Sequence, residues 1–147
     1  MKKAIGIALL LLLVGVTAGY AKTKSIAKDN VNVRAKPSRQ APILFVAPKG
    51  YPLWVRQQQK NWVQVEDWQG KRGWVYRPLI SAIPTAVVQV ETANVRKSPS
   101  RRASRVTQAK HGEIYRVFAS QGDWVKIGYY FENEKLGWIH RDLVWGY

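Results

Sequence analysis

The sequence predicts an all-β protein composed of two small β-barrels in tandem. The first observation is an internal repeat, in which segment 32–39 reads NVRAKPSR and segment 94–101 reads NVRKSPSR. The second is that apolar residues occur in short alternating runs bounded by turn residues, which is typical of strands. The third is size, because a unit of about 60 residues buries only a thin core. Closing such a sheet into a barrel removes the exposed edges that promote aggregation.

The repeat continues well beyond these two segments. Each copy goes on with a glycine turn, an apolar strand, a Trp-Val pair and a Gly-Trp pair. The offset between the copies is 62 residues from Asn32 to Val65 and 64 residues at the Gly-Trp pair. The second copy therefore has two extra residues between Val125 and Gly137. A self-match at a fixed period indicates one structural unit that is built twice.

Residues 1–21 lie before the repeat and have the form of a secretory signal peptide. Two lysines precede an unbroken apolar run, 4–16, and small residues up to Ala21 mark the expected cleavage site. The apolar run is shorter than the roughly 20 residues that cross a bilayer, which favours a cleaved signal over a retained membrane anchor. We therefore expect an exported protein that begins near Lys22 and has no stable membrane span after cleavage.

Eight strands are expected from the alternating runs, and turn residues such as those at 48–50, 69–71 and 121–123 separate them. Each run is rich in Val, Ile, Trp and Tyr, which favour strands. The expected strands are 43–46, 53–56, 62–65 and 74–76 in the first copy, and 88–90, 115–118, 124–127 and 138–140 in the second. Short turns are expected near 77–79 and 141–143.

The strands define two barrels joined by a short linker. The first barrel is expected to extend from residue 25 to 81 and the second from residue 86 to 147, with residues 82–85 between them. A linker of this length does not let the two halves move independently. We expect two barrels that are in contact or held in a fixed tandem.

Apolar residues that recur at matching positions are expected to fill the two cores. Gly73 and Gly137 each precede a Trp at the start of a strand, which suits a close backbone approach where a Cβ would clash. The expected core of the first barrel consists of Trp62, Trp74, Val33, Leu53, Val55, Val65 and Leu79. That of the second barrel consists of Trp124, Trp138, Val95, Tyr115, Val117, Ile127 and Leu143.

The same landmarks resemble a known family, the bacterial SH3-like domain. The resemblance is carried by the NVR strand end, the Pro-Ser loop, the Trp-Val pairs and the Gly-Trp pairs, and it covers essentially the whole chain after residue 21. It implies a small five- to six-stranded barrel, periplasmic or secreted, of a bacterial envelope that binds a ligand and catalyses no reaction. Lys36 and Ser98 stand where the family often has a glycine before the loop proline, so the family's loop shape is not carried over to these positions.

Aromatic residues that break the repeat are candidates for a ligand-binding surface. Strand alternation points Trp54 outward, and its counterpart in the second copy is Arg116. The aromatic candidates are Trp54, Trp68, Tyr129 and Tyr130. Exposed aromatic rings on a basic domain indicate a recognition surface. The alternative is that the two barrels bury Trp54 or Trp68 against each other.

Basic residues concentrate in the loop that follows each NVR segment. The basic candidates are Lys36, Arg39, Arg101, Arg102 and Arg105. Side chains of this kind can hold carboxylates or phosphates through several hydrogen bonds, although a merely solvated loop has the same composition. Arg34 and Arg96 recur identically, which indicates a structural role for this pair.

The charge of the chain points to an anionic partner or surface. The formal net charge is +15, and it is +13 without residues 1–21, which contain two of the 24 Lys and Arg and none of the nine Asp and Glu. Residues 22–84 contribute +9 and residues 85–147 contribute +4. A charge of this size favours association with anionic polymers or acidic proteins, and it also promotes solubility.

Catalysis, metal binding and cofactor binding are not expected. The chain has no cysteine, which excludes lipoprotein attachment, disulfide bonds and thiolate metal sites. It has no glycine-rich phosphate loop. Its two histidines, His111 and His140, occupy unrelated positions without acidic residues spaced for a triad or a metal site.

Two functions remain open from the sequence. The first is a binding module for cell-wall glycan or peptide (peptidoglycan), or for another anionic envelope polymer. The second is an interaction subunit that docks an acidic or proline-containing envelope protein. Charge and aromatic content also fit nucleic acid, but export separates the protein from most of it.

Overall fold

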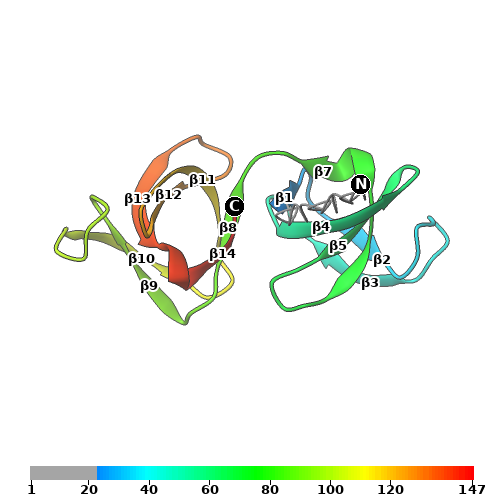
Figure 1. Ribbon diagram of the computed structural model, residues 1–147, viewed down its shortest axis with the longest axis horizontal. Helices are drawn as coiled ribbons and strands as arrows, with labels where there is room; N and C mark the ends of the chain where they lie inside the picture. The colour runs from blue at the N-terminus through cyan, green and yellow to red at the C-terminus, as the bar shows by residue number, and fades with distance from the viewer. Residues whose placement is uncertain (1–22) are drawn as a thin grey trace, which may run out of the picture.

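The computed structural model describes residues 23–147 and confirms an all-β fold of two tandem small barrels (Figure 1). The predicted signal peptide lies outside the described residues. Over residues 23–147, the structure contains no helix with the length and apolar character needed to cross a bilayer.

The first barrel is a seven-stranded antiparallel sheet with the strand order β3-β2-β6-β5-β4-β1-β7. Its elements are β1 (Thr23–Ile26), β2 (Val31–Arg34), β3 (Ile43–Ala47), β4 (Pro52–Gln59), β5 (Trp62–Glu66), β6 (Arg72–Tyr76), the 3-10 helix η1 (Arg77–Leu79) and β7 (Ile80–Ser81). The predicted turn near residues 77–79 is this 3-10 helix.

The second barrel repeats the first element by element. Its elements are β8 (Thr85–Val88), β9 (Thr92–Arg96), β10 (Arg105–Lys110), β11 (Ile114–Gln121), β12 (Trp124–Gly128), β13 (Lys135–His140), the 3-10 helix η2 (Arg141–Leu143) and β14 (Val144–Gly146). The strand order is β10-β9-β13-β12-β11-β8-β14, which is the order of the first sheet with each strand replaced by its counterpart. The internal repeat is therefore a repeat of structure.

Six strands were not among the eight expected from alternation, namely β1, β2, β7, β9, β10 and β14, so each sheet has seven strands rather than five or six. One expected strand also differs in position. The sequence predicts a strand at 88–90, whereas β8 occupies Thr85–Val88. All four residues of β8 are buried, because the strand belongs to the second barrel and also contacts the first. A short strand that is buried on both faces has no alternation for sequence reasoning to find.

Each barrel encloses its own core of aliphatic side chains. The predicted core residues Val33, Leu53, Val65, Val95, Tyr115, Val117 and Ile127 are buried, and Val55, Leu79 and Leu143 pack against the cores while partly exposed. The predicted core role is wrong for Trp62, Trp124 and Trp138, which are only half-buried. Trp74 is buried but lies outside the core cluster.

Strand alternation explains the position of the tryptophans. In β5, Val63 and Val65 point into the core, so Trp62 points to the outer face. In β6, Val75 points inward and Trp74 does not. The expected close approach at the neighbouring glycine is confirmed, because a Cβ on Gly73 would lie 2.5 Å from a methyl group of Val33. The counterpart of Val75 in the second core is Ile139.

The two barrels are in contact, as the short linker predicts. The hydroxyl of Thr85 donates a buried hydrogen bond of 2.6 Å to the carbonyl oxygen of Gly50 in the first barrel. The hydroxyl of Ser25 donates to the carbonyl oxygen of the linker residue Ile83 at 2.7 Å. The first bond links β8 to the turn before β4, and the second links β1 to the linker.

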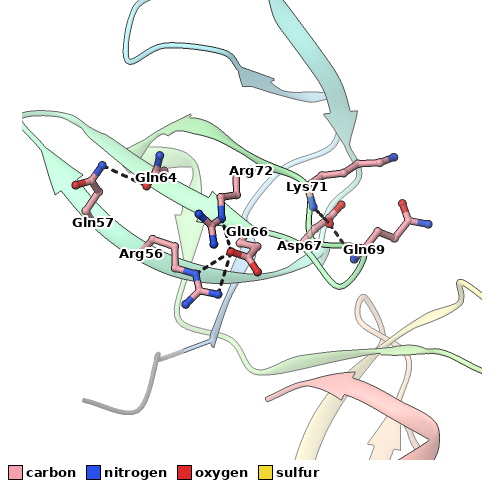
Figure 2. Close-up of polar contacts among 8 residues, drawn as sticks. All are labelled: Arg56, Gln57, Gln64, Glu66, Asp67, Gln69, Lys71 and Arg72. Carbon is pink, nitrogen blue, oxygen red and sulfur yellow. Dashed lines mark hydrogen bonds and ion pairs between the residues drawn. The ribbon is translucent and has the colours of Figure 1, made fainter. Parts of the chain in front are cut away.

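Two adjacent acidic residues at the end of β5 have different roles (Figure 2). One carboxylate oxygen of Glu66 accepts hydrogen bonds from Arg56, at 3.0 Å, and Arg72, at 2.6 Å. The hydrogen bond from Arg56 is the main cause that lowers the pKa of Glu66. Asp67 is buried, and its Oδ1 accepts the backbone N–H groups of Gln69 and Lys71, which closes the turn before β6.

Replacing Glu66 by glutamine is expected to lower the melting temperature at neutral pH and to have little effect in acid. Because the pKa of Glu66 is lower in the folded than in the unfolded protein, the ionised carboxylate stabilises the fold above its ordinary pKa of 4.5. That contribution is lost as pH falls through the folded-state pKa. Thermal melts of wild type and Glu66→Gln at a series of pH values measure this effect, with the exposed Glu91→Gln as control. A difference in melting temperature that stays constant with pH contradicts the prediction.

Candidate functional site

Each barrel has a groove on its outer surface, and the two grooves are built from corresponding residues. The first groove has a volume of about 350 Å³ and the second groove about 390 Å³. The corresponding lining residues are Asn32 and Asn94, Arg34 and Arg96, Arg39 and Arg101, Trp62 and Trp124, Tyr76 and His140, and Leu79 and Leu143. The repeat therefore duplicates a concave surface as well as a fold.

A pair of aromatic rings lies at the centre of each groove. Trp62 and Tyr76 are directly opposite each other on β5 and β6, with their ring centres 5.7 Å apart and an edge-to-face arrangement. Trp124 and His140 are paired in the same way on β12 and β13, at 5.3 Å. The neighbouring residues Val63 and Val75 point into the core, so both rings of the first pair point away from it. Because the two rings stand on directly opposite residues of adjacent strands, sheet geometry determines their spacing.

Two arginines contribute to each groove in different ways, one at the end of the NVR strand and one in the loop that follows it. The guanidinium groups of Arg34 and Arg96 donate hydrogen bonds of 2.8 Å to the carbonyl oxygens of Ala41 and Ala103, respectively. The predicted structural role of this pair is confirmed, because each arginine closes its own loop. Arg39 is exposed, and its guanidinium carbon lies 5.4 Å from the centre of the Tyr76 ring. Arg39 thus extends over the first groove.

The second groove has a different polar end. His140 replaces Tyr76, and its Nδ1 accepts a hydrogen bond from the backbone N–H of Asp142 at 3.4 Å. The Asp142 carboxylate also lies 3.6 Å from Nδ1. Arg101 lines this groove as Arg39 lines the first. The second groove therefore combines a tryptophan, an imidazole, a carboxylate and a guanidinium group.

These side chains can bind a ligand, and their chemistry suits one that is partly apolar and partly anionic. Sugar faces or methyl groups can pack against the aromatic rings, and the guanidinium groups can donate paired hydrogen bonds to carboxylates or phosphates. In the part of the chain from residue 23 on, no three His, Asp or Glu side chains are placed to hold a metal ion.

The predicted ligand residue Trp54 lies at the junction of the two barrels. Its ring centre is 5.0 Å from that of Trp145 on β14, and it is half-buried. Trp54 and Trp145 also line a hollow of about 490 Å³ between the barrels. Trp54 therefore lines a third concavity and neither groove, although this hollow shares Asp142 with the second groove.

Trp68 also lies at the junction and is held there by a chain of hydrogen bonds. Its Nε1–H donates to the hydroxyl oxygen of Tyr51 at 3.1 Å, and that hydroxyl donates to Asp67 at 3.0 Å. Burial, followed by the negative charge of Asp67, raises the pKa of Tyr51 well above its ordinary range. The Trp68 ring lies 5.3 Å from His111 of the second barrel. The contact between barrels considered for Trp54 and Trp68 is thus present for both.

Tyr129 and Tyr130 lie in the loop between β12 and β13, which contains the two extra residues of the second copy. Together with the exposed Phe131 they line a hollow of about 350 Å³. Lys49 of the first barrel extends into it, with its ammonium nitrogen 5.3 Å from the Tyr130 ring centre and 4.7 Å from that of Phe131. The two tyrosines are therefore also separate from both grooves.

The five predicted basic residues separate into two groups. Arg39 and Arg101 line the grooves. Lys36, Arg102 and Arg105 are exposed and line neither groove. Sequence reasoning did not select the aromatic pairs of the grooves. Alternation contains the missing signal, because Trp62 shares its strand parity with the polar residues Gln64 and Glu66.

Comparison with known proteins gives two matches to family models. A bacterial SH3 domain model matches residues 27–82, and a second bacterial SH3 domain model matches residues 91–144. Each match covers most of one sheet and begins after its first strand, β1 or β8.

Among curated proteins, the chain is similar to YrvJ of Bacillus subtilis (strain 168), a candidate N-acetylmuramoyl-L-alanine amidase. The two are 28% identical over 126 residues, which cover 75% of this chain and 24% of YrvJ. The chain thus spans about a quarter of the length of this relative.

Among solved structures, the chain is similar to a Bacillus cereus NlpC/P60 family protein and to NlpC1 from Trichomonas vaginalis. The first is 12% identical with a TM-score of 0.40, and covers 86% of this chain and 56% of that protein. The second is 15% identical with a TM-score of 0.39, and covers 95% of this chain and 51% of that protein.

Proposed function

Because the chain belongs to the bacterial SH3 domain family, we propose that it is a non-catalytic binding protein of the cell envelope whose two grooves recognise peptidoglycan. The observation that carries the proposal is the duplicated groove, with an aromatic pair and an arginine at corresponding positions in both barrels. A surface that is repeated together with its chemistry indicates that both copies bind the same class of ligand. We place the protein outside the cytoplasm, in the periplasm or secreted.

Of the anionic envelope polymers that could be the ligand, peptidoglycan is favoured by the name of the relative YrvJ. That name specifies N-acetylmuramoyl-L-alanine, a unit that joins a sugar to an amino acid. A sugar face or an alanine methyl group fits the ring pair of each groove, and peptide carboxylates fit Arg39 and Arg101. Only the recognition of such a polymer is carried over here, because the match covers 24% of YrvJ.

Sedimentation with purified cell-wall sacculi tests the proposal directly. Wild type is expected to sediment with the sacculi at low salt and to be released as salt increases, because the Debye length falls from about 10 Å at 0.1 M to about 3 Å at 1 M. Wild type that stays in the supernatant at low salt overturns peptidoglycan recognition. That result favours the alternative function, an interaction subunit for an acidic envelope protein.

Replacing Arg101, Arg102 and Arg105 by glutamine is expected to flatten the salt dependence. Each lost guanidinium removes a screened attraction, so the variant loses more binding at low salt than at high salt. The triple variant and wild type are compared by the bound fraction across a salt series. A slope equal to that of wild type shows that these side chains do not contact the polymer.

Trp54 provides the matched contrast to the arginines. We propose it as a secondary contact in the hollow between the barrels, together with Tyr129 and Tyr130 in the hollow next to Lys49. Stacking and apolar burial depend little on ionic strength, so Trp54→Ala is expected to lower the affinity by the same factor at every salt concentration. Because Trp54 also contacts Trp145 across the junction, Trp145→Ala is the comparison: a ligand contact by Trp54 predicts a larger loss for Trp54→Ala. An equal loss in the two variants, a factor that changes with salt, or no loss at all removes Trp54 from the binding surface.

A further inference from the structure

The edge strand β3 exposes a run of apolar side chains. Ile43, Leu44 and Val46 are 49%, 51% and 52% exposed. β3 stands at the end of the strand order and, over the described residues, pairs with β2 alone. Its outer edge therefore presents backbone N–H and C=O groups next to apolar side chains.

The second barrel shows that the fold does not require these apolar residues. Strand β10 occupies the same place, and the repeat aligns Ile43 with Arg105 and Val46 with Gln108. Both strands also have a shift in pairing register at the same point, one residue after their start. Leu44 aligns with the apolar Val106, so the two strands differ at two of the three exposed positions. The barrel therefore does not require an apolar side chain at position 43 or 46.

Natural sheets protect their edges, and β3 lacks the usual protection. Charged residues, lysine above all, normally discourage a second chain from pairing with an edge. β10 begins with Arg105 and ends with Lys110, whereas β3 contains no charged residue. An edge of this kind accepts an added strand, because main-chain hydrogen bonds supply affinity and the side chains on each face supply specificity.

The charges around β3 favour an acidic occupant. Lys36 lies in the loop that leads into the strand and is exposed. The ammonium nitrogen of Lys71 lies 5.9 Å from the ring centre of Phe45 on β3. Residues 22–84 carry a formal charge of +9, so a second copy of this barrel is repelled and an acidic segment is attracted. Lipid acyl chains are a poorer match, since they cannot satisfy the backbone groups of the edge.

We propose that β3 is a docking edge for an extended segment of a partner protein in which apolar and acidic side chains alternate. The segment adds to the first barrel as a strand beside β3, with its apolar side chains against Leu44 and Val46. This surface shares no residue with either groove. The inference is therefore independent of peptidoglycan recognition.

A designed peptide tests the proposal without knowledge of the natural partner. The probe is a fluorescently labelled, capped peptide of about ten residues in which valine and glutamate alternate, and the control peptide alternates serine and glutamate. Wild type is expected to bind the valine peptide, and its β3 backbone amides are expected to gain protection from hydrogen exchange. The double variant Ile43→Gln with Val46→Gln replaces two exposed apolar side chains of β3 by neutral polar ones, at positions where β10 is also polar, and adds no positive charge that would attract the acidic peptide. We expect it to remain folded and to bind at least about tenfold more weakly.

Val106→Gln is the matched control, because Val106 is the equally exposed apolar residue of β10. It is expected to leave peptide binding unchanged. The proposal is overturned if the two peptides bind equally, if the double variant binds as well as wild type, or if added protection appears on β10 rather than β3. Sedimentation velocity showing a dimer that the double variant abolishes assigns the edge to a second copy. If wild type binds phosphatidylglycerol vesicles but not the valine peptide, and the double variant loses the vesicle binding, the β3 edge is assigned to a membrane.

Discussion

Removing both groove tryptophans, as Trp62→Ala with Trp124→Ala, is expected to abolish sedimentation with sacculi at low salt. Each tryptophan provides the largest apolar surface of its groove, and truncating a central aromatic contact commonly costs about 2 kcal/mol or more in binding free energy. That loss corresponds to a roughly thirtyfold weaker affinity for each groove. Each single variant retains one intact groove and is expected to bind more weakly than wild type but measurably.

Trp138→Ala is the control for this experiment. Trp138 is half-buried on the outer face of β13 and lines neither groove. Its variant is expected to sediment as wild type does, provided that circular dichroism shows an intact fold for all variants. If the double variant binds sacculi as well as wild type, the grooves are not the recognition site.

Ile139→Ala is expected to lower the free energy of unfolding of the second barrel by about 2 to 5 kcal/mol. Ile139 is fully buried in the second core cluster, so its truncation loses apolar burial and leaves a cavity. For a domain of this size, such a loss is a large part of the total stability, which is about 5 to 15 kcal/mol for native proteins. Chemical denaturation followed by tryptophan fluorescence measures the change.

Val106→Ala supplies the comparison for the core variant, because Val106 is 51% exposed on an edge strand. A surface change of this kind is expected to shift the unfolding free energy by no more than about 0.5 kcal/mol. Equal unfolding midpoints for the two variants contradict the core assignment. The sequence alone places Trp138 rather than Ile139 at this position of the core, so the pair Ile139→Ala and Trp138→Ala also tests the corrected parity of β13.

The fold was predictable because its signals are local and occur twice. Alternating apolar residues between turns indicate strands, and a second copy of the same pattern removes most of the ambiguity in one copy. The contact between the barrels followed from the length of the linker. The strand β8 was misplaced because it is buried on both faces, so its apolar run carries no alternation.

The grooves were not predicted because an aromatic residue next to apolar residues is usually assigned to the hydrophobic core. Trp62 is followed by the alternating residues Val63, Gln64, Val65 and Glu66, and only one parity places both valines inside. That parity places Trp62 outside, where a ring of its size forms the wall of a groove. Consistent use of alternation would have moved both groove tryptophans from the core to the surface.

The partners of Trp54 and Trp68 could not be read from the sequence in the same way. Their rings meet Trp145 and His111, which are 91 and 43 residues further along the chain. No periodic pattern connects positions in different barrels. Alternation indicates that a side chain leaves its own core, but it does not indicate what the side chain then meets.

The buried hydrogen bond from Thr85 to Gly50 has a consequence for affinity. With the Trp54–Trp145 contact it restricts the movement of one barrel against the other, so the separation of the two grooves is restricted as well. If the grooves bind a polymer as we propose, the second groove meets the next repeat of a polymer held by the first at a local effective concentration on the order of millimolar. Two weak sites then produce an avidity that can exceed the affinity of either by about 10² to 10⁴. That gain is confined to polymers whose repeat spacing matches the separation of the two grooves. The junction would therefore select ligands by their repeat spacing.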